Sequence, residues 1–279
     1  MKNKQLTIVI NTFRSSDKIF KCLNSIRSTY KVIIVENSSD VNFKKIIEKK
    51  YKNVKCYLTE QNLGYAKGNN FGLNLVKTKF SLILNPDAIL NKNTLSNFLK
   101  FSDEHKNFSI VGPYEKDHKN LKHNNMPYEV DKIKGFAMFL KMKDFKYKNF
   151  FDKNFFIYCE EIDLCKRIRK NNKKIFIDPR IKIKHLGGSS HNKSINFEME
   201  LSRNWHWMWS QFYFNKKHYG YFYSLFRFFP KLVFSFIKSF FYFILFNNEK
   251  FQIYFHRFLG LFNSMILRSS FYRPKVKLL

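Results

Sequence analysis

The sequence predicts an α/β protein, with a mostly parallel sheet covered by helices on both faces and a helical C-terminal appendage. Up to about residue 179, short apolar runs alternate with segments of helical periodicity, and strand–helix–strand repetition of this kind produces parallel sheets. After about residue 191, acidic residues become rare and long apolar segments follow one another. We therefore expect two domains, residues 1–200 and residues 201–279.

Four short apolar runs in the first part are expected to be strands. They are rich in β-branched or aromatic residues and are bounded by polar turns, as is typical of strands buried on both faces. These runs are residues 6–10, 32–35, 54–58 and 80–84. The helix after the first run would be capped by Ser16 or Asp17, and residues 41–50 and 65–76 form the next two helical patterns.

Composition and charge limit the classes of partner and compartment. The net charge of the 279 residues is +30, which favours anionic partners such as nucleotides, nucleic acid or acidic lipids. Part of this charge reflects residues read from A- and T-rich codons, as do the 34 phenylalanines. The four cysteines show no metal-binding spacing, and their scarcity indicates a reducing compartment. Since the first apolar run is too short for a signal peptide, we expect a cytoplasmic protein.

Polar residues follow each of the four expected strands, at residues 11–14, 36–40, 62–70 and 85–87. In a parallel sheet the loops after the strands meet at one edge, and ligands bind there. A nucleoside diphosphate needs polar groups for its base and ribose, closely approaching backbone for its phosphates, and a carboxylate for the metal that neutralises it. These loops offer all three, and they predict a nucleotide site with a divalent cation.

Seven segments follow one another along the chain: TIVINTF, VIIVENSSD, NLGYAKGNNFGL, LILNPDAIL, GFAMFLKMKDF, FDKNFFIYCEEIDLCKRIRK and HLGGSS. In this order they resemble the family 2 glycosyltransferases with a GT-A fold, especially their rhamnosyltransferase-like branch. The resemblance covers about residues 5–190, and it implies a GT-A, Rossmann-like catalytic domain over residues 1–200.

The resemblance also implies a set of donor-binding and metal-binding residues. The donor-binding residues are Thr12, Phe13, Glu36, Asn62, Gly64, Lys67, Asn69 and Asn85. Asp87 matches the carboxylate of the family's metal-binding element, and His185 matches a histidine that completes the metal or diphosphate site, so the implied cofactor is Mg²⁺ or Mn²⁺. The chain departs from the family at Glu36, where aspartate is usual, and the longer side chain changes how the base or ribose is held.

The catalytic base is implied by the segment that reads Glu160-Glu161-Ile162-Asp163-Leu164. The family has aspartate where this chain has Glu161, which is therefore the first candidate, with Asp163 and Glu160 as the alternatives. One carboxylate that removes the acceptor proton, without a covalent intermediate, inverts the configuration at the anomeric carbon. We expect an inverting, metal-dependent glycosyltransferase.

Each of these residues also has a purely structural interpretation. Carboxylates in the first turn of a helix are stabilised by its dipole alone. Asp87 is also a common kind of turn residue, and a histidine in a loop such as His185 is often a surface residue. Asn69 and Asn70 can cap or interrupt the helix in which they lie.

The apolar segment at residues 221–246 carries its polar groups on one narrow helical stripe. The stripe holds Ser224, Arg227, Lys231, Lys238 and Tyr242. A cationic stripe beside a broad apolar face is typical of a helix that lies in a membrane interface, whereas lysines inside a transmembrane span are costly. Packing within the domain or in a homodimer is the second interpretation.

A second, looser basic set lies just before this segment. It consists of Arg203, Lys216, Lys217 and His218. The set is either a solvated face or a contact for an anionic acceptor or a lipid phosphate.

The sequence thus favours transfer of a sugar from a nucleotide-diphosphate donor to a lipid-linked saccharide or polysaccharide in surface glycan synthesis, by a protein peripheral to the inner face of the cytoplasmic membrane. The branch favours dTDP-rhamnose, and UDP- or GDP-sugars are compatible. A sugar nucleotidyltransferase is the alternative enzyme, but residues 11–16 lack its glycine-rich phosphate loop. The net positive charge is also compatible with a nucleic-acid-binding protein. The lysines are scattered along the chain, however, so we expect no nucleic-acid partner.

Overall fold

The structure is a computed structural model of the chain and describes residues 4–15, 18–114, 126–145, 150–187 and 193–274. The predicted caps Ser16 and Asp17, and Gly188 to Ser190 of the HLGGSS segment, lie outside these residues. The chain divides into two compact units, Met1–Asp152 with Glu161–Asn192, and Lys153–Glu160 with Lys193–Leu279. The predicted functional limit at residue 200 lies inside helix α6 (Asn196–Tyr219) and stays a prediction.

One half of the main sheet in the first unit consists of parallel strands. They are β1 (Leu6–Thr12), β2 (Lys31–Glu36), β3 (Val54–Leu58) and β4 (Phe80–Leu84), in the spatial order β3-β2-β1-β4. All four coincide with the expected strands, because near-continuous runs of apolar residues are buried on both faces of such a sheet.

The other half of the sheet mixes parallel and antiparallel pairs and continues from β4. Its strands are β8 (Ala137–Lys141), β6 (Ile110–Pro113), β9 (Ile175–Asp178) and β7 (Tyr128–Glu129). Strand β8 runs antiparallel to both β4 and β6. A separate antiparallel pair joins β5 (Ala88–Leu90) to β10 (Ile183–His185).

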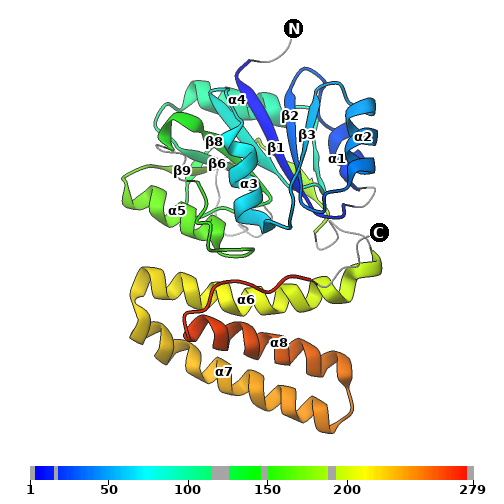
Figure 1. The fold of residues 1–279 in the computed structure, drawn as a ribbon. Coiled ribbons are helices and arrows are strands. Elements are labelled where there is room, and N and C mark those ends of the chain that lie inside the picture. Colours follow the sequence, from blue (N-terminus) through cyan, green and yellow to red (C-terminus); the bar gives the residue numbers. More distant parts are fainter. Residues whose placement is uncertain (1–3, 16–17, 115–125, 146–149, 188–192, 275–279) are drawn as a thin grey trace. The chain divides into compact units, whose positions relative to one another are not determined.

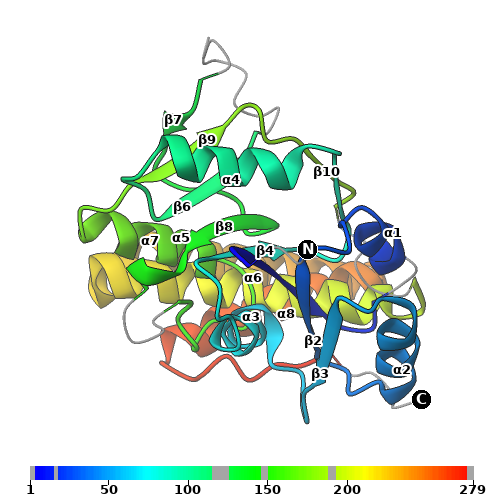
Figure 2. The same cartoon turned by 90° about the horizontal axis from the view of Figure 1, so that it is seen from above.

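Helices cover both faces of this sheet, as expected. Those of the first unit are α1 (Lys18–Asn24), α2 (Val41–Lys50), α3 (Gly64–Asn74), α4 (Thr94–Glu104) and α5 (Glu160–Lys170), with a short 3₁₀ turn η2 (Met142–Asp144). Ile8 and Ile10 share one core with α1, α2 and α4. Val9 points to the other face, where a Cβ added to Gly72 of α3 would lie 2.5 Å from its Cγ1. Figure 2 shows α4 and α3 on opposite sides of the sheet.

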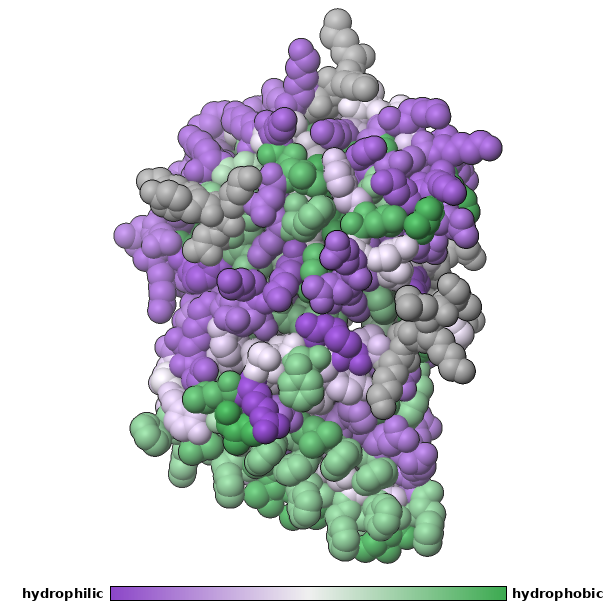
Figure 3. All heavy atoms as spheres, viewed as in Figure 1, coloured by the Kyte–Doolittle hydropathy of each residue, from purple (hydrophilic) through white to green (hydrophobic). Residues whose placement is uncertain are grey.

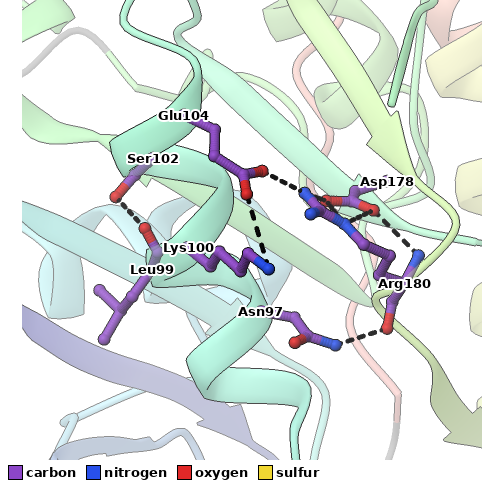
Figure 4. Close-up of polar contacts among 7 residues, drawn as sticks. All are labelled: Asn97, Leu99, Lys100, Ser102, Glu104, Asp178 and Arg180. Atoms are coloured by element: carbon purple, nitrogen blue, oxygen red, sulfur yellow. Dashed lines mark hydrogen bonds and ion pairs between the residues drawn. The ribbon is translucent and has the colours of Figure 1, made fainter. Parts of the chain in front are cut away.

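An ion cluster fixes the segment between β9 and β10 against α4 (Figure 4). The Arg180 guanidinium donates to the buried Asp178 carboxylate and, at 2.7 Å, to Glu104. These hydrogen bonds, that with Asp178 first, raise the pKa of Arg180. Asn97 and Thr94 of α4 donate to the backbone carbonyls of Arg180 and Lys182. The cluster therefore holds the strand that carries His185.

The second unit is helical in its C-terminal part, with α6, α7 (Tyr221–Ile244) and α8 (Asn248–Met265) after a short 3₁₀ turn η4 (Lys193–Ile195) (Figure 1). Helices α6 and α8 cross closely at Gly260, where a Cβ would lie 2.1 Å from the backbone oxygen of Trp205. None of the helices in the described part of the chain meets the length and hydropathy needed to span a membrane.

The polar stripe expected on residues 221–246 needs one correction. Ser224 is fully buried, and its hydroxyl donates to the carbonyl of Gly220 at 2.8 Å. Lys231 and Lys238 lie 3.4 Å from Gln211 of α6 and 3.5 Å from Tyr254 of α8, respectively. The stripe therefore forms the packing side of α7 and its margin, because small and polar residues allow the three helices to approach.

Candidate active site

The loops that follow β1, β2 and β3 are joined directly to one another at the carboxyl edge of the sheet. The Asn37 N–H donates to the carbonyl of Thr12 at 2.8 Å, and the Thr59 N–H donates to that of Glu36 at 3.1 Å. The ladder thus extends past the strand ends, and it places the three polar loops side by side, as the parallel topology predicted.

Asn11 and Asn37, to which the sequence assigned no role, join these loops by side-chain hydrogen bonds that we call the Asn11–Asn37 lock. The Asn11 amide donates to the carbonyls of Gly64 and Tyr65 at 2.9 and 3.3 Å. Its oxygen accepts from the Asn37 amide, whose own oxygen accepts from the Leu63 N–H. An asparagine at the end of a buried strand needs polar partners, so the sequence could have indicated a hydrogen-bonding role for Asn11. It could not have shown which residues are the partners.

Glycine at position 68 makes room for this lock. A Cβ there would lie 2.6–2.8 Å from the side-chain amide of Asn11. We expect Gly68→Ala to leave the fold intact, because a flexible side chain can move away. It should raise the donor KM about tenfold, since the Asn11 hydrogen bonds to the carbonyls of Gly64 and Tyr65, beside the predicted donor-binding residues, are lost. Initial-rate kinetics check this. Gly72→Ala is the control, because it meets Val9 in the core and should lower the melting temperature without changing the donor KM.

Thr12 and Glu36, predicted to lie against the nucleoside, are both buried at this edge. The Thr12 hydroxyl donates to the carbonyl of Val35 at 3.3 Å. The Glu36 carboxylate accepts from the N–H groups of Ser38 and Asp40 at 2.9–3.1 Å, so it shapes the loop after β2. Contact of either residue with a nucleoside stays a prediction, as it does for Phe13, which is partly buried.

The donor residues implied on α3 and just before it differ in burial and in their hydrogen bonds. Asn62 accepts from the N–H of Gly64 at 3.0 Å, and Gly64 has a φ of 72°, which glycine adopts easily. Lys67 is exposed. Asn69 is fully buried, and its amide donates to the carbonyl of Tyr65 at 2.9 Å, which supports its structural interpretation.

The metal candidates Asp87 and His185, far apart in sequence, are brought together by the β5–β10 pair. His185 lies opposite Ala88 in this pair, and its Nε2 is 3.3 Å from Oδ1 of Asp87. The His185 ring stacks on Phe136 at 4.4 Å between centroids. The two atoms are within ion-pair distance, but the contact lacks hydrogen-bond geometry: Oδ1 is buried and accepts no hydrogen bond from the described residues.

These two side chains fit a divalent cation. A buried carboxylate oxygen without a donor is unfavourable unless a cation or a ligand completes it, and oxygen with imidazole nitrogen suits Mn²⁺. No third histidine, cysteine or carboxylate joins a cluster in the part of the chain that the structure describes, so the remaining ligands would be water and diphosphate oxygens.

Two neighbours of Asp87 have other roles. Burial, followed by the Asp87 charge, raises the pKa of Cys22 to about 12. Asn85 contributes backbone here, donating to the carbonyl of Phe136 at 2.8 Å.

Glu161 has the properties of a proton acceptor. Burial raises its pKa, more than the N–H groups of Glu161 and Ile162 and the charge of Lys132 lower it. Its Oε2 is shielded from solvent and makes no hydrogen bond with the described residues. A Cβ on Gly135 would lie 3.6 Å from the Glu161 Cβ and 3.1 Å from the Tyr65 hydroxyl, so Glu161 lies near the start of α3.

The alternative carboxylates are placed differently. Asp163 is fully buried and accepts from Arg167 Nε at 2.8 Å, and Arg167 also donates to the carbonyl of Phe150. This pairing is a structural role, and it favours Glu161 as the base. Glu160 is buried as the first residue of α5.

Among solved structures, the fold is similar to that of sugar-transferring enzymes. Mannosyltransferase PcManGT from Pyrobaculum calidifontis, in complex with GDP-Man and Mn²⁺, has a TM-score of 0.60 at 10% identity, covering 95% of this chain and 88% of that one. GalNAc-T7 with UDP, GalNAc and Mn²⁺ has a TM-score of 0.57 at 12% identity, covering 65% of this chain and 43% of that one. At these identities the likeness concerns the fold, which is of the GT-A class.

Residues 7–176, more than half of the chain, match the family described as Glycosyl transferase family 2. The chain therefore belongs to this family and is a glycosyltransferase. It is 25% identical over 226 residues to rhamnosyltransferase WbbL of Escherichia coli (strain K12), covering 68% of this chain and 83% of that protein. Membership of the family favours sugar transfer over the nucleotidyl transfer and nucleic-acid binding considered above.

Proposed function

We propose that this enzyme is an inverting glycosyltransferase that moves a sugar, rhamnose first among the candidates, from a nucleoside diphosphate to a lipid-linked saccharide or polysaccharide. One observation carries the proposal. Gly135 and Phe136 are adjacent in the chain. Glu161 lies beside Gly135, and the ring of His185, which contacts Asp87, stacks on Phe136. The candidate proton acceptor and the candidate cation-binding pair thus both lie next to this dipeptide, which supports direct displacement at an anomeric carbon.

The chemistry follows from these positions. The bond between the anomeric carbon and the diphosphate oxygen breaks, and a bond to the acceptor oxygen forms on the opposite face. Glu161 takes the proton of the acceptor hydroxyl, and its raised pKa makes it a better base near neutral pH. A divalent cation at Asp87 and His185 would supply charge neutralisation for the departing nucleoside diphosphate. The Asn11–Asn37 lock holds the backbone at Leu63 and Gly64, which lies against the donor.

The likeness to WbbL supports rhamnose as the transferred sugar, and the mannosyltransferase fold neighbour supports testing GDP-sugars as well. We further propose that the enzyme works on the cytoplasmic side of a membrane, where nucleotide sugars and lipid-linked acceptors meet. The scarcity of cysteines, four in 279 residues, agrees with a reducing compartment.

The test is a transfer assay with dTDP-rhamnose, UDP- and GDP-sugars and a set of polyprenyl-diphosphate saccharides. We expect one donor to give a product of inverted anomeric configuration, determined by nuclear magnetic resonance, and its formation to need Mg²⁺ or Mn²⁺. A product with retained configuration would refute the mechanism. Donor hydrolysis or transfer to water-soluble glycans alone would refute the lipid-linked acceptor.

A further inference from the structure

Helix α7 buries small polar side chains and exposes large apolar ones, which is unexpected for a helix that contacts only water and protein. Its fully or nearly buried residues are Ser224, Phe228, Ser235 and Ser239. Its exposed large apolar residues are Phe222, Tyr223, Phe226, Phe229, Val233, Phe234, Phe236, Ile237, Phe240, Phe241, Phe243 and Ile244. Phe226 alone is 87% exposed. Serines pack inside while phenylalanines point outward, the reverse of the usual pattern.

Helix α8 extends this surface. Phe236 and Phe243 of α7 contact Phe258 and Phe251 of α8, at 5.4 and 5.6 Å between ring centroids. Three further apolar residues, Phe255 and Phe262 of α8 and Ile266 directly after it, are more than a third exposed. We call these exposed residues of α7 and α8 the α7–α8 apolar face, and Figure 3 shows hydrophobic side chains gathered over these two helices.

The α7–α8 apolar face is too large to be incidental. Its 15 residues, most of them aromatic, leave on the order of 1,000 Å² of apolar surface exposed. The largest apolar patch of a typical monomer is about 300–600 Å². Something other than water therefore covers this face when the enzyme works.

The positive charge of the C-terminal region indicates which kind of partner covers the α7–α8 apolar face. Residues 201–279 contain 12 lysines and arginines and one acidic residue, Glu249. The ammonium group of Lys231 lies over the Phe228 ring at 4.7 Å and that of Lys238 over the Phe234 ring at 4.8 Å, so both positive charges lie against aromatic side chains of α7. A second copy of this face would bring the same positive charge, whereas an anionic lipid surface is complementary in both charge and hydropathy.

We propose that the α7–α8 apolar face is the docking surface for an anionic phospholipid bilayer. Phenylalanine side chains enter the acyl boundary, and Arg227, Lys231 and Lys238 contact lipid phosphates at its margin. The structure thus assigns insertion to two adjacent helices with a cationic margin. This inference rests on the proposed function only for the idea that the acceptor is itself held in the membrane.

The experiment is co-sedimentation of the full chain with phosphatidylcholine vesicles, with and without phosphatidylglycerol, in the absence of donor and acceptor. We expect the wild type to prefer anionic vesicles, and this preference should shrink as salt rises. Phe226→Ser combined with Phe240→Ser should weaken partition about a hundredfold, because two large apolar side chains no longer enter the lipid. Both side chains are exposed, so the fold should be retained. Ile46→Ser, an exposed apolar change on α2, is the matched control.

The charge term is tested separately. Arg227→Gln, Lys231→Gln and Lys238→Gln remove the positive charge but keep a polar side chain, and each should reduce partition to anionic vesicles about fivefold, with little change on neutral ones. Equal partition of the wild type to both vesicles at all salt concentrations would overturn the assignment of an anionic lipid. Absence of vesicle binding, with a dimer that Phe226→Ser and Phe240→Ser dissociate, would show that the face joins two copies instead.

Failure of the docking and failure of the proposed function remain distinguishable. If docking is correct, the doubly substituted enzyme should bind vesicles poorly yet retain wild-type transfer to a detergent-solubilised acceptor. If the wild type docks but transfers no sugar to any lipid-linked acceptor, the proposed function fails and the docking inference stands.

Discussion

Glu161→Gln is expected to lower kcat by about two to four orders of magnitude, because the amide cannot accept the proton of the acceptor hydroxyl. Donor binding should remain near that of the wild type, since the change is isosteric and the proposed role of Glu161 is on the acceptor. Single-turnover kinetics with a saturating donor, together with donor titration by calorimetry, separate the two effects. Glu249→Gln, the same chemical change in the first turn of α8, is the matched control and should leave kcat unchanged.

The pH profile gives this prediction a second measurement. Burial raises the pKa of Glu161 above its ordinary value, and the base works only when deprotonated. The rate of the wild type should therefore fall as the pH drops through that raised pKa, and the residual rate of Glu161→Gln should lack this acidic limb.

Asp163→Asn distinguishes the two carboxylates. Because Asp163 is buried against Arg167, this variant should lose thermal stability. An inactive Asp163→Asn enzyme of normal stability, beside an active Glu161→Gln enzyme, would move the catalytic role to Asp163.

Asp87→Ala should reduce kcat/KM by about two to three orders of magnitude, because the negative charge of the departing diphosphate would lose the cation that we propose this carboxylate holds. Mn²⁺ binding in the presence of the nucleoside diphosphate should weaken in parallel, as followed by calorimetry. Without added cation, the melting temperature should be equal to or higher than that of the wild type, since a buried carboxylate oxygen that accepts no hydrogen bond is removed.

Asp103→Ala serves as the control for this variant, because its side chain is 70% exposed on α4. It should change neither Mn²⁺ binding nor turnover. Wild-type turnover of Asp87→Ala in Mg²⁺ or Mn²⁺ would refute the metal assignment.

Sequence patterns located the parallel strands because β1 to β4 are short apolar runs whose burial depends little on their neighbours. The antiparallel β8 and the β5–β10 pair were not predicted, since pairing between segments far apart in the chain leaves no local periodicity. For the same reason, the sequence showed that Asn11 and Asn37 stand at strand ends but not that their side chains form a hydrogen bond. The 3.3 Å contact between Asp87 and His185 likewise needed β10 to lie beside β5.

By itself, the sequence determined the α/β class, the family resemblance and which residue types stand at the ends of the strands, because these follow from local order along the chain. Only the tertiary structure decided how those residues are used. It paired Asp163 with Arg167, left Glu161 with a raised pKa, and turned the serines of α7 inward. Burial, hydrogen-bond partners and the direction in which a helix faces are set by contacts between distant segments, and the free energy of those contacts is not encoded in any single stretch of residues.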